Sequence, residues 1–321
     1  MIDSATLKVW EERLFKDFDV FFFENKEEAS ELLPREGLVM TKEEFKQDGS
    51  FYSMDVNNNL TLWNLKKAAN YVGVLPAGLF AQIPLQQQMR ILQEQVRLGR
   101  GFVWTDIHIE ELFRTSAREK KVEIKSLLQE HFLYEAEGLA VYFIDQINWS
   151  GLSGQKKVFF IQTMADLFID PAPAWEQLPL SVQNKIRDQY DHLMDYINHF
   201  PLINGANCFS AALAMATEDK ELAVWIIKQW VQPQALLFGL EQRNYERVEI
   251  HSGNILTHLL EDDILLWKKD GALIHACYYL GENYAFNKNG QMIFNPWQIV
   301  TVEGLLQSWE GNVEIYRKKL R

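Results

Sequence analysis

The feature that most constrains this chain is a cysteine placed at the start of a helix and followed, further along, by two apolar strands. The cysteine is Cys208, which follows a turn-forming run and opens an alanine-rich, helix-favouring segment, residues 209–216. Residues 263–267 and 272–280 are apolar runs typical of two paired strands, and the later run contains His275. A cysteine at a helix start and a histidine on a strand are the components of a thiolate–imidazole nucleophile.

A helix N-terminus is a site that activates a thiol. The pKa of a free cysteine, about 8.5, falls to roughly 3.5–7.5 at a helix N-terminus or beside an imidazolium. Asn207 is the expected cap, and the unpaired N–H groups of the first turn would point at the sulfur of Cys208. His275 would then accept the thiol proton and return it to the leaving group. Taken singly, a free cysteine is more often an inert core residue, and a histidine in an apolar strand is more often a hydrogen-bonded core residue.

The order of these segments resembles that of the NlpC-type cell-wall peptidases, a bacterial branch of the papain-like superfamily. That family has an Asp-Cys or Asn-Cys step opening a helix, then a Gly-Asp-Leu-type strand, then a strand reading His-x-Gly-x-Tyr-x-Gly. This chain has Asn207-Cys208, then Asp263-Ile264-Leu265-Leu266-Trp267, then His275-Ala276-Cys277-Tyr278-Tyr279-Leu280-Gly281. The resemblance covers about residues 181–317. It implies an α+β, papain-like domain with helices packed on an antiparallel sheet, and hydrolysis of amide bonds.

The resemblance also implies two further site residues. Asn287, twelve residues after His275, would hold the imidazole through one hydrogen bond, although an asparagine cannot stabilise an imidazolium as a carboxylate would. Tyr196, twelve residues before Cys208, would be an oxyanion donor together with the Cys208 backbone N–H. A tyrosine that only packs its helix is an equally good interpretation of Tyr196.

Several departures from the family pattern keep a second hypothesis open. Phe209 replaces the small residue that follows the cysteine, and Cys277 stands where glycine is usual. The separation of 67 residues between Cys208 and His275 (275 − 208) predicts an insertion over residues 233–258, bordering the cleft. The second hypothesis is a catalytically inactive, papain-like binding or scaffolding protein. An open cleft at Cys208 would favour the enzyme, and a cleft plugged by Phe209 or by N-terminal residues would favour the binding protein.

Cys277 also raises a redox question. It lies two residues from His275 on the same strand, so both side chains are expected on one face. A reversible disulfide between Cys208 and Cys277 is one interpretation, and a small core side chain is the other.

The length of 321 residues indicates two domains. The predicted boundary is a proline-punctuated connector over residues 170–174. It separates a mostly helical N-terminal region, residues 1–170, from the papain-like domain, residues 175–321. In the N-terminal region the predicted helices cover residues 5–16, 27–33, 62–72, 85–98, 106–113 and 122–132, with a short one over residues 163–168. A predicted β-hairpin joins residues 139–144 to residues 158–161.

Charge and composition restrict the partners. A net charge of −12 argues against nucleic acid, because phosphate binding needs clustered Lys and Arg. The lack of a membrane-length apolar run or an export signal near the start predicts a cytoplasmic protein without a membrane partner. His192 and His199 lack the spacing of a helical metal site, so neither a metal nor a cofactor is expected.

The resemblance implies a peptide or peptidoglycan-fragment substrate, including γ-D-glutamyl peptides, for which imported or recycled fragments suit a cytoplasmic chain. The sequence does not determine the oligomeric state or the role of residues 1–170.

Overall fold

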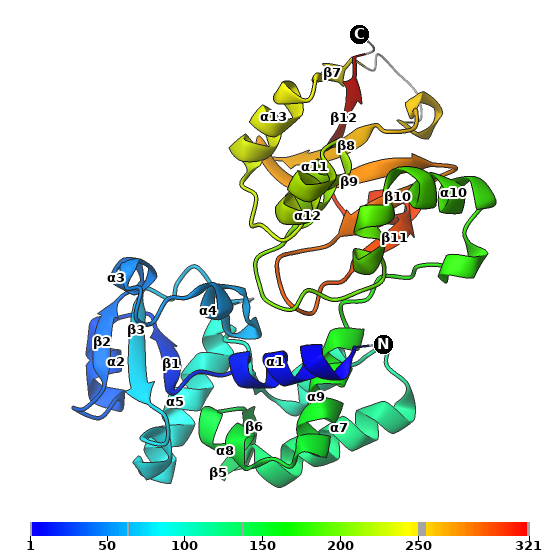
Figure 1. Cartoon of the computed structure of the whole chain (residues 1–321). Helices are drawn as coiled ribbons and strands as arrows, with labels where there is room; N and C mark the ends of the chain where they lie inside the picture. Colours follow the sequence, from blue (N-terminus) through cyan, green and yellow to red (C-terminus); the bar gives the residue numbers. More distant parts are fainter. Residues whose placement is uncertain (1, 63, 137, 250–254, 320–321) are drawn as a thin grey trace. The chain divides into compact units, whose positions relative to one another are not determined.

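The computed structural model describes residues 2–62, 64–136, 138–249 and 255–319. The chain divides into two compact units (Figure 1). The N-terminal unit comprises residues 7–167, and the C-terminal unit comprises residues 168–319 together with residues 2–6. The division therefore falls just before the proline-punctuated connector of residues 170–174.

The N-terminal unit contains two small antiparallel sheets with helices packed around them. The first sheet has the order β1-β3-β2 and the second has the order β4-β6-β5. The strands are β1 (Phe18–Phe23), β2 (Leu38–Thr41), β3 (Tyr71–Pro76), β4 (Val103–Trp104), β5 (Leu133–Ala136) and β6 (Leu139–Phe143). The helices are α1 (Ser4–Arg13), α2 (Lys26–Leu32), α3 (Lys42–Gln47), α4 (Met54–Asn58), α5 (Leu85–Leu98), α6 (Asp106–Leu112), α7 (Arg118–His131), α8 (Gln146–Gly151) and α9 (Gly154–Asp166), with 3₁₀ turns η1 (Leu60–Leu62) and η2 (Phe80–Gln82).

Local sequence signals located most of the predicted helices here, including those over residues 5–16 and 27–33, which correspond to α1 and α2. The helix over residues 85–98 is α5, and Gly99 ends it in the left-handed conformation at φ 75°. The helices predicted over residues 106–113 and 122–132 correspond to α6 and α7. The helix predicted over residues 62–72 is wrong, because its C-terminal residues start β3.

The predicted hairpin is also wrong in one of its two strands. Residues 158–161 belong to α9, whose N-cap Ser153 accepts a hydrogen bond from the Lys156 N–H. Phe160, Ile161 and Met164 bury one helical face, so the apolar run has a helical role. The hairpin that forms joins β5 to β6.

The C-terminal unit has a six-stranded antiparallel sheet and is α+β, as predicted. The strand order is β11-β10-β9-β8-β12-β7. The strands are β7 (Tyr245–Val248), β8 (Ile264–Lys269), β9 (Ala272–Gly281), β10 (Tyr284–Lys288), β11 (Trp297–Thr301) and β12 (Asn312–Lys318). The helices are α10 (Leu180–Gln189), α11 (Cys208–Met215), α12 (Lys220–Ile226), α13 (Pro233–Gln242) and α14 (Val302–Ser308), with 3₁₀ segments η3 (Trp175–Gln177), η4 (Asp191–Tyr196) and η5 (Ile255–His258).

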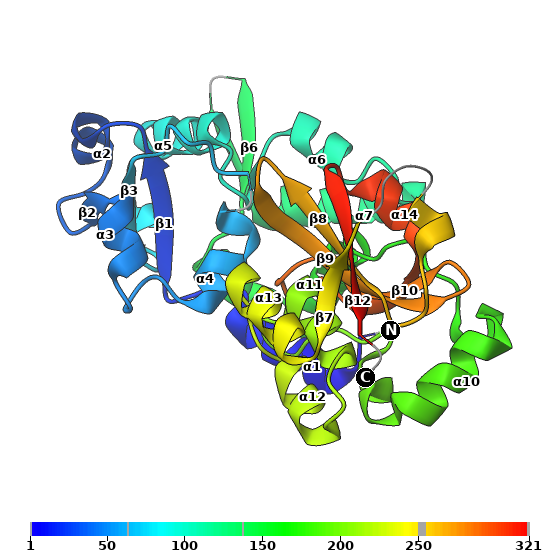
Figure 2. The same ribbon diagram turned by 90° about the horizontal axis from the view of Figure 1, so that it is seen from above.

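The two faces of this sheet bury different side chains. Residues that alternate along β8 and β9 pack with α11, α12 and α13 on one face, which we call the α11 face: Ile264, Leu266, Ala276, Tyr278 and Leu280. The intervening residues pack with α14 on the other, which we call the α14 face: Leu265, Trp267, Cys277 and Tyr279. Figure 2 shows α11 and α14 on opposite sides of β9.

The segment predicted as an insertion has regular structure in its described part. Pro233 is the first residue of α13, where its missing N–H costs nothing, and β7 then joins the edge of the sheet. Residues 250–254, including His251, lie outside the described residues.

Candidate functional site

Cys208 is the first residue of α11, and its position is fixed by a capping box. The Asn207 side chain accepts a hydrogen bond from the Ser210 backbone N–H at 3.0 Å. The Ser210 hydroxyl accepts one from the Asn207 backbone N–H, also at 3.0 Å. The Asn207 side-chain amide donates to the Val231 carbonyl at 2.8 Å. The predicted cap is therefore confirmed, and the sulfur stands where the first helical turn begins.

The predicted ionisation of this thiol is wrong. Only 6% of Cys208 is exposed, and burial raises the pKa of the thiol to about 11. The backbone N–H groups of Ala276 and Phe209 and the charge of Lys288 lower that pKa, but by less than burial raises it. In this conformation the desolvation of a thiolate outweighs the favourable field of the helix N-terminus.

Lys288 is a site residue that the sequence did not reveal. It is fully buried, and its ammonium donates to the carbonyls of Gly290 at 2.6 Å and Met292 at 3.3 Å. It lies 5.5 Å from the centre of the Trp297 ring. Burial lowers the pKa of Lys288 to about 7, while the nearby Cys208 raises it. The alternation of side chains along β10 could have located Lys288 from the sequence. Lys288 follows Asn287, so its side chain points to the opposite face of the sheet.

His275 lies on the α14 face and is completely buried. Its ring stacks on Trp309 at 4.1 Å with an interplanar angle of 8°, and meets Trp267 edge-on at 5.2 Å. Neither ring nitrogen has a hydrogen-bond partner among the described residues. Burial lowers the pKa of His275 to about 3, so the ring is neutral at pH 7.

Asn287 lies beside His275. It raises the pKa of the imidazole, although neither ring nitrogen has a hydrogen bond of normal geometry to it. The Asn287 side-chain amide donates to Asn289 Oδ1 at 2.9 Å, whereas its own Oδ1 is buried without a partner in the described part of the chain. The oxygen of Asn287 is therefore the atom left to face the ring.

Cys208 and His275 approach the same peptide from different sides. Cys208 packs in the core of the α11 face, whereas the imidazole lies on the α14 face. The Ala276 backbone N–H interacts with the sulfur, so the sulfur lies near the peptide that joins His275 to Ala276. The expected hydrogen bond between thiol and imidazole is not formed, because the ring nitrogens have no partner among the residues described.

Tyr196 lies on the α11 face. It ends the 3₁₀ segment η4, and its ring meets Trp297 edge-on at 5.1 Å. Lys228 Nζ lies 6.0 Å from the centre of the same ring. These contacts account for its packing, and the expected oxyanion role of its hydroxyl stays a prediction.

Cys277 is fully buried in the core of the α14 face, and both thiols are free. The sheet therefore separates the cores in which Cys208 and Cys277 pack.

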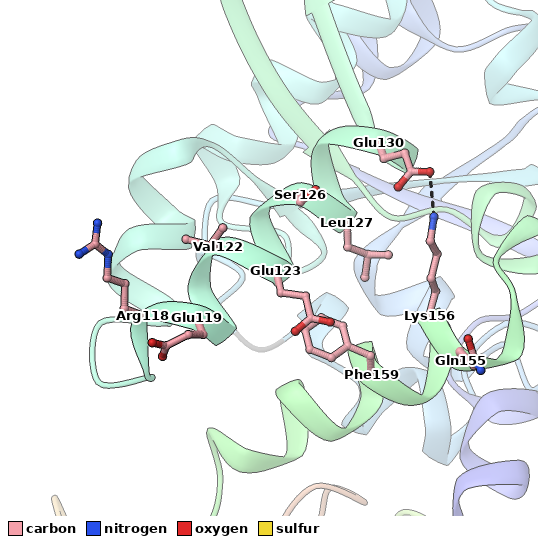
Figure 3. A pocket seen from close by; sticks show the side chains of 10 residues that line it. All are labelled: Arg118, Glu119, Val122, Glu123, Ser126, Leu127, Glu130, Gln155, Lys156 and Phe159. Atoms are coloured by element: carbon pink, nitrogen blue, oxygen red, sulfur yellow. Dashed lines mark hydrogen bonds and ion pairs between the residues drawn. The ribbon is translucent and has the colours of Figure 1, made fainter.

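The N-terminal unit has an open hollow of about 830 Å³ between α7 and α9 (Figure 3). Glu119, Glu123 and Glu130 of α7 line one side, and Lys156 and Phe159 of α9 line the other. Lys156 pairs with Glu130 at 2.8 Å. The mixed charges and apolar patches do not identify an occupant.

Within the described ranges, no group of three or more His, Cys, Asp or Glu residues could hold a metal ion. Over the same ranges, no helix combines the length and apolarity needed to cross a membrane.

Comparison of the chain with protein-family models, with curated proteins and with solved structures found no match.

Proposed function

We propose that the chain is a cysteine hydrolase of amide bonds whose site is closed in this conformation, with a neutral thiol and a neutral imidazole. The observation that carries the proposal is the convergence of three buried polar groups on one peptide. The Cys208 sulfur lies near the backbone N–H of Ala276, which is part of the peptide that joins His275 to Ala276. The His275 side chain leaves the other residue of that peptide, and Asn287 lies beside its ring. Asn287 Oδ1 and the nearer ring nitrogen face each other without a hydrogen bond of normal geometry, and the other ring nitrogen has no partner among the described residues.

Orphaned polar atoms are costly in a core. Each buried group left without a hydrogen bond costs about 1–3 kcal/mol, so such atoms are rare where a residue serves packing alone. Apolar side chains of similar size at positions 275 and 287 would avoid that cost. The ring nitrogen farther from Asn287, which has no partner in the described part of the chain, is therefore the atom that would gain a partner when the site opens.

In the proposed reaction, neutral His275 takes the proton of the Cys208 thiol as the sulfur attacks the substrate carbonyl. The imidazolium then gives that proton to the departing amine, and a thioester forms on Cys208. Water, deprotonated by His275, attacks the thioester, and the carboxylic acid leaves as the thiol regains its proton. Lys288 would stabilise the negative charge that develops near the sulfur.

The closed conformation cannot carry out the first step unaided. Burial raises the pKa of the Cys208 thiol to about 11 and lowers the pKa of His275 to about 3, so proton transfer from the thiol to the ring is strongly unfavourable in the closed conformation. Burial is the main cause of both shifts. Opening the site to water or to a polar substrate would reduce the desolvation of both groups, and displacing Trp309 would uncover His275. Because Cys208 packs on the α11 face and the imidazole lies on the α14 face, the first step also requires a rearrangement that brings the ring and the sulfur together.

The substrate class follows from the resemblance to NlpC-type peptidases. It is a peptide or peptidoglycan fragment, such as a γ-D-glutamyl peptide. The proposal includes no metal, cofactor, nucleic-acid or membrane partner, and it takes the protein to be cytoplasmic.

A second candidate function is a papain-like binding or scaffolding protein without catalysis. The specific observation in its favour is the burial of Cys208 and Phe209, each 6% exposed. It predicts that peptides bind without being cut.

The test is hydrolysis of γ-D-glutamyl tri- and tetrapeptides, followed by the appearance of free amines. Wild type is compared with Cys208→Ala, and Cys277→Ala serves as the matched thiol control. The hydrolase predicts turnover by wild type and Cys277→Ala and none by Cys208→Ala. Equal rates in wild type and Cys208→Ala would reject the hydrolase, and binding without turnover would support the second candidate.

A further inference from the structure

Asp170 is anchored next to the strands that carry the candidate site. Its backbone N–H donates to Gln298 Oε1 at 3.0 Å, and the Gln298 side-chain amide donates to the Asp170 carbonyl at 3.1 Å. Gln298 is buried on β11 and stands directly opposite Asn287 of β10 in the antiparallel register. This two-point pairing fixes the connector against the sheet beside Asn287.

A chain of side-chain hydrogen bonds then runs from Asp170 toward His275. The Asn289 side-chain amide donates to the Asp170 carboxylate. Asn289 Oδ1 accepts from the Asn287 side-chain amide at 2.9 Å and from Trp309 Nε1 at 3.4 Å. Asn287 Oδ1 is the remaining polar atom of its side chain, and Asn287 lies beside the imidazole.

Two groups impose the direction of this chain. Trp309 Nε1 can only donate, so it also favours an Asn289 oxygen on its side, but at 3.4 Å its contact is long, and the Asp170 carboxylate makes the closer contact. An ionised carboxylate only accepts hydrogen bonds, so Asn289 must turn its NH₂ group toward Asp170. Its oxygen is then left for Asn287, which must also present its NH₂ group. The oxygen of Asn287 is therefore left to face His275, and an oxygen can only accept. An asparagine side chain alone has no such preference, since its two ends are nearly the same size.

We infer that Asp170 is a positioning residue that sets the tautomer of His275, acting through Asn289 and Asn287. The ring nitrogen nearer Asn287 carries the hydrogen, and the other nitrogen keeps the lone pair that a thiol proton needs. The effect on rate rests on the proposed hydrolase, whereas the tautomer itself does not. Because burial keeps the pKa of His275 at about 3, the ring is neutral at pH 7.5 and its tautomer is defined there.

The test is the ¹⁵N spectrum of His275 at pH 7.5, recorded on the full chain. Wild type should give one nitrogen typical of N–H and one typical of a lone pair. Asp170→Asn keeps the size of the side chain but can donate or accept, so both nitrogens should move toward averaged values. Asn289→Leu breaks the chain at its middle with Asp170 retained, and should do the same. Asp188→Asn, an exposed change in α10, is the control and should leave the spectrum unchanged.

A His275 spectrum that is the same in wild type, Asp170→Asn and Asn289→Leu would overturn the inference, whatever the activity. If the tautomer changes as expected but wild type hydrolyses no amide, the proposed function fails and the inference stands. If wild type is active, kcat of Asp170→Asn should fall by about 10-fold or more, less than the about 10⁴-fold seen when a triad histidine is held directly in the wrong tautomer.

Discussion

Alkylation of Cys208 by iodoacetamide measures the state of the thiol directly. The thiolate is the reactive form, and the pKa of about 11 leaves a thiolate fraction of about 3 × 10⁻⁴ at pH 7.5. A free cysteine with a pKa of about 8.5 has a fraction of about 0.1 at that pH. The ionisation state alone therefore makes Cys208 about 300-fold slower than free cysteine, and its burial slows it further.

The pH dependence of the alkylation rate shows in which direction the pKa of Cys208 is shifted. Because burial raises the pKa, the thiol stays protonated until the pH approaches 11, and the rate should rise about tenfold per pH unit from pH 7 to 10. The assay is intact-mass labelling in a Cys277→Ala background, with Cys208→Ala and the urea-unfolded protein as controls. Labelling at pH 6 that is faster than that of free cysteine would refute the argument, because it would mean that the helix N-terminus outweighs burial.

Three further predictions concern stability and the cover over the site. Burial lowers the pKa of His275 from 6.5 to about 3, so wild type loses stability as the pH falls below 6.5. In urea titrations, the free energy of unfolding of wild type should fall by about 3 kcal/mol more than that of His275→Phe between pH 7 and 4.5. Equal losses in the two proteins would contradict the burial of His275. Asn207→Ala should lower the free energy of unfolding by about 1 kcal/mol, because it removes the N-cap of α11. The control is Asn184→Ala, on the exposed side of α10. Equal stabilities of the two variants would argue against the capping box. Trp309→Ala should admit water to the His275 ring and so raise its pKa toward the ordinary value. The pKa is measured by following the His275 ¹⁵N signals with pH. An unchanged pKa would mean that Trp309 does not shield the ring from water.

What the sequence predicted well was governed by short-range rules. Asn207 before a helix-favouring run is sufficient to place a cap, and Gly99 is sufficient to end α5. The α+β arrangement of the C-terminal unit followed from helices first and apolar strands later. Residues 158–161 were wrongly predicted as a strand, because a short apolar run is compatible with either a strand or a buried helix. The N-cap at Ser153 begins α9, and these residues continue that helix.

The site required information that is not local. Alternation predicts that His275 and Cys277 share a face, but only the packing of α11 determines which face that is. The same packing buries Cys208 and reverses the predicted direction of its pKa shift. Asp170 was interpreted as part of a connector, and its contact with Asn289 spans 119 positions of sequence, which no motif in either segment indicates.

The central claim is that Cys208 forms a covalent bond to substrate with His275 as its base. The most direct measurement is the intact mass of the protein after incubation with a γ-D-glutamyl peptide and an acid quench. The account predicts an added acyl mass on wild type that maps to Cys208 and is absent from Cys208→Ala and His275→Gln. An unmodified Cys208 in wild type, under conditions where the peptide is shown to bind, would contradict it.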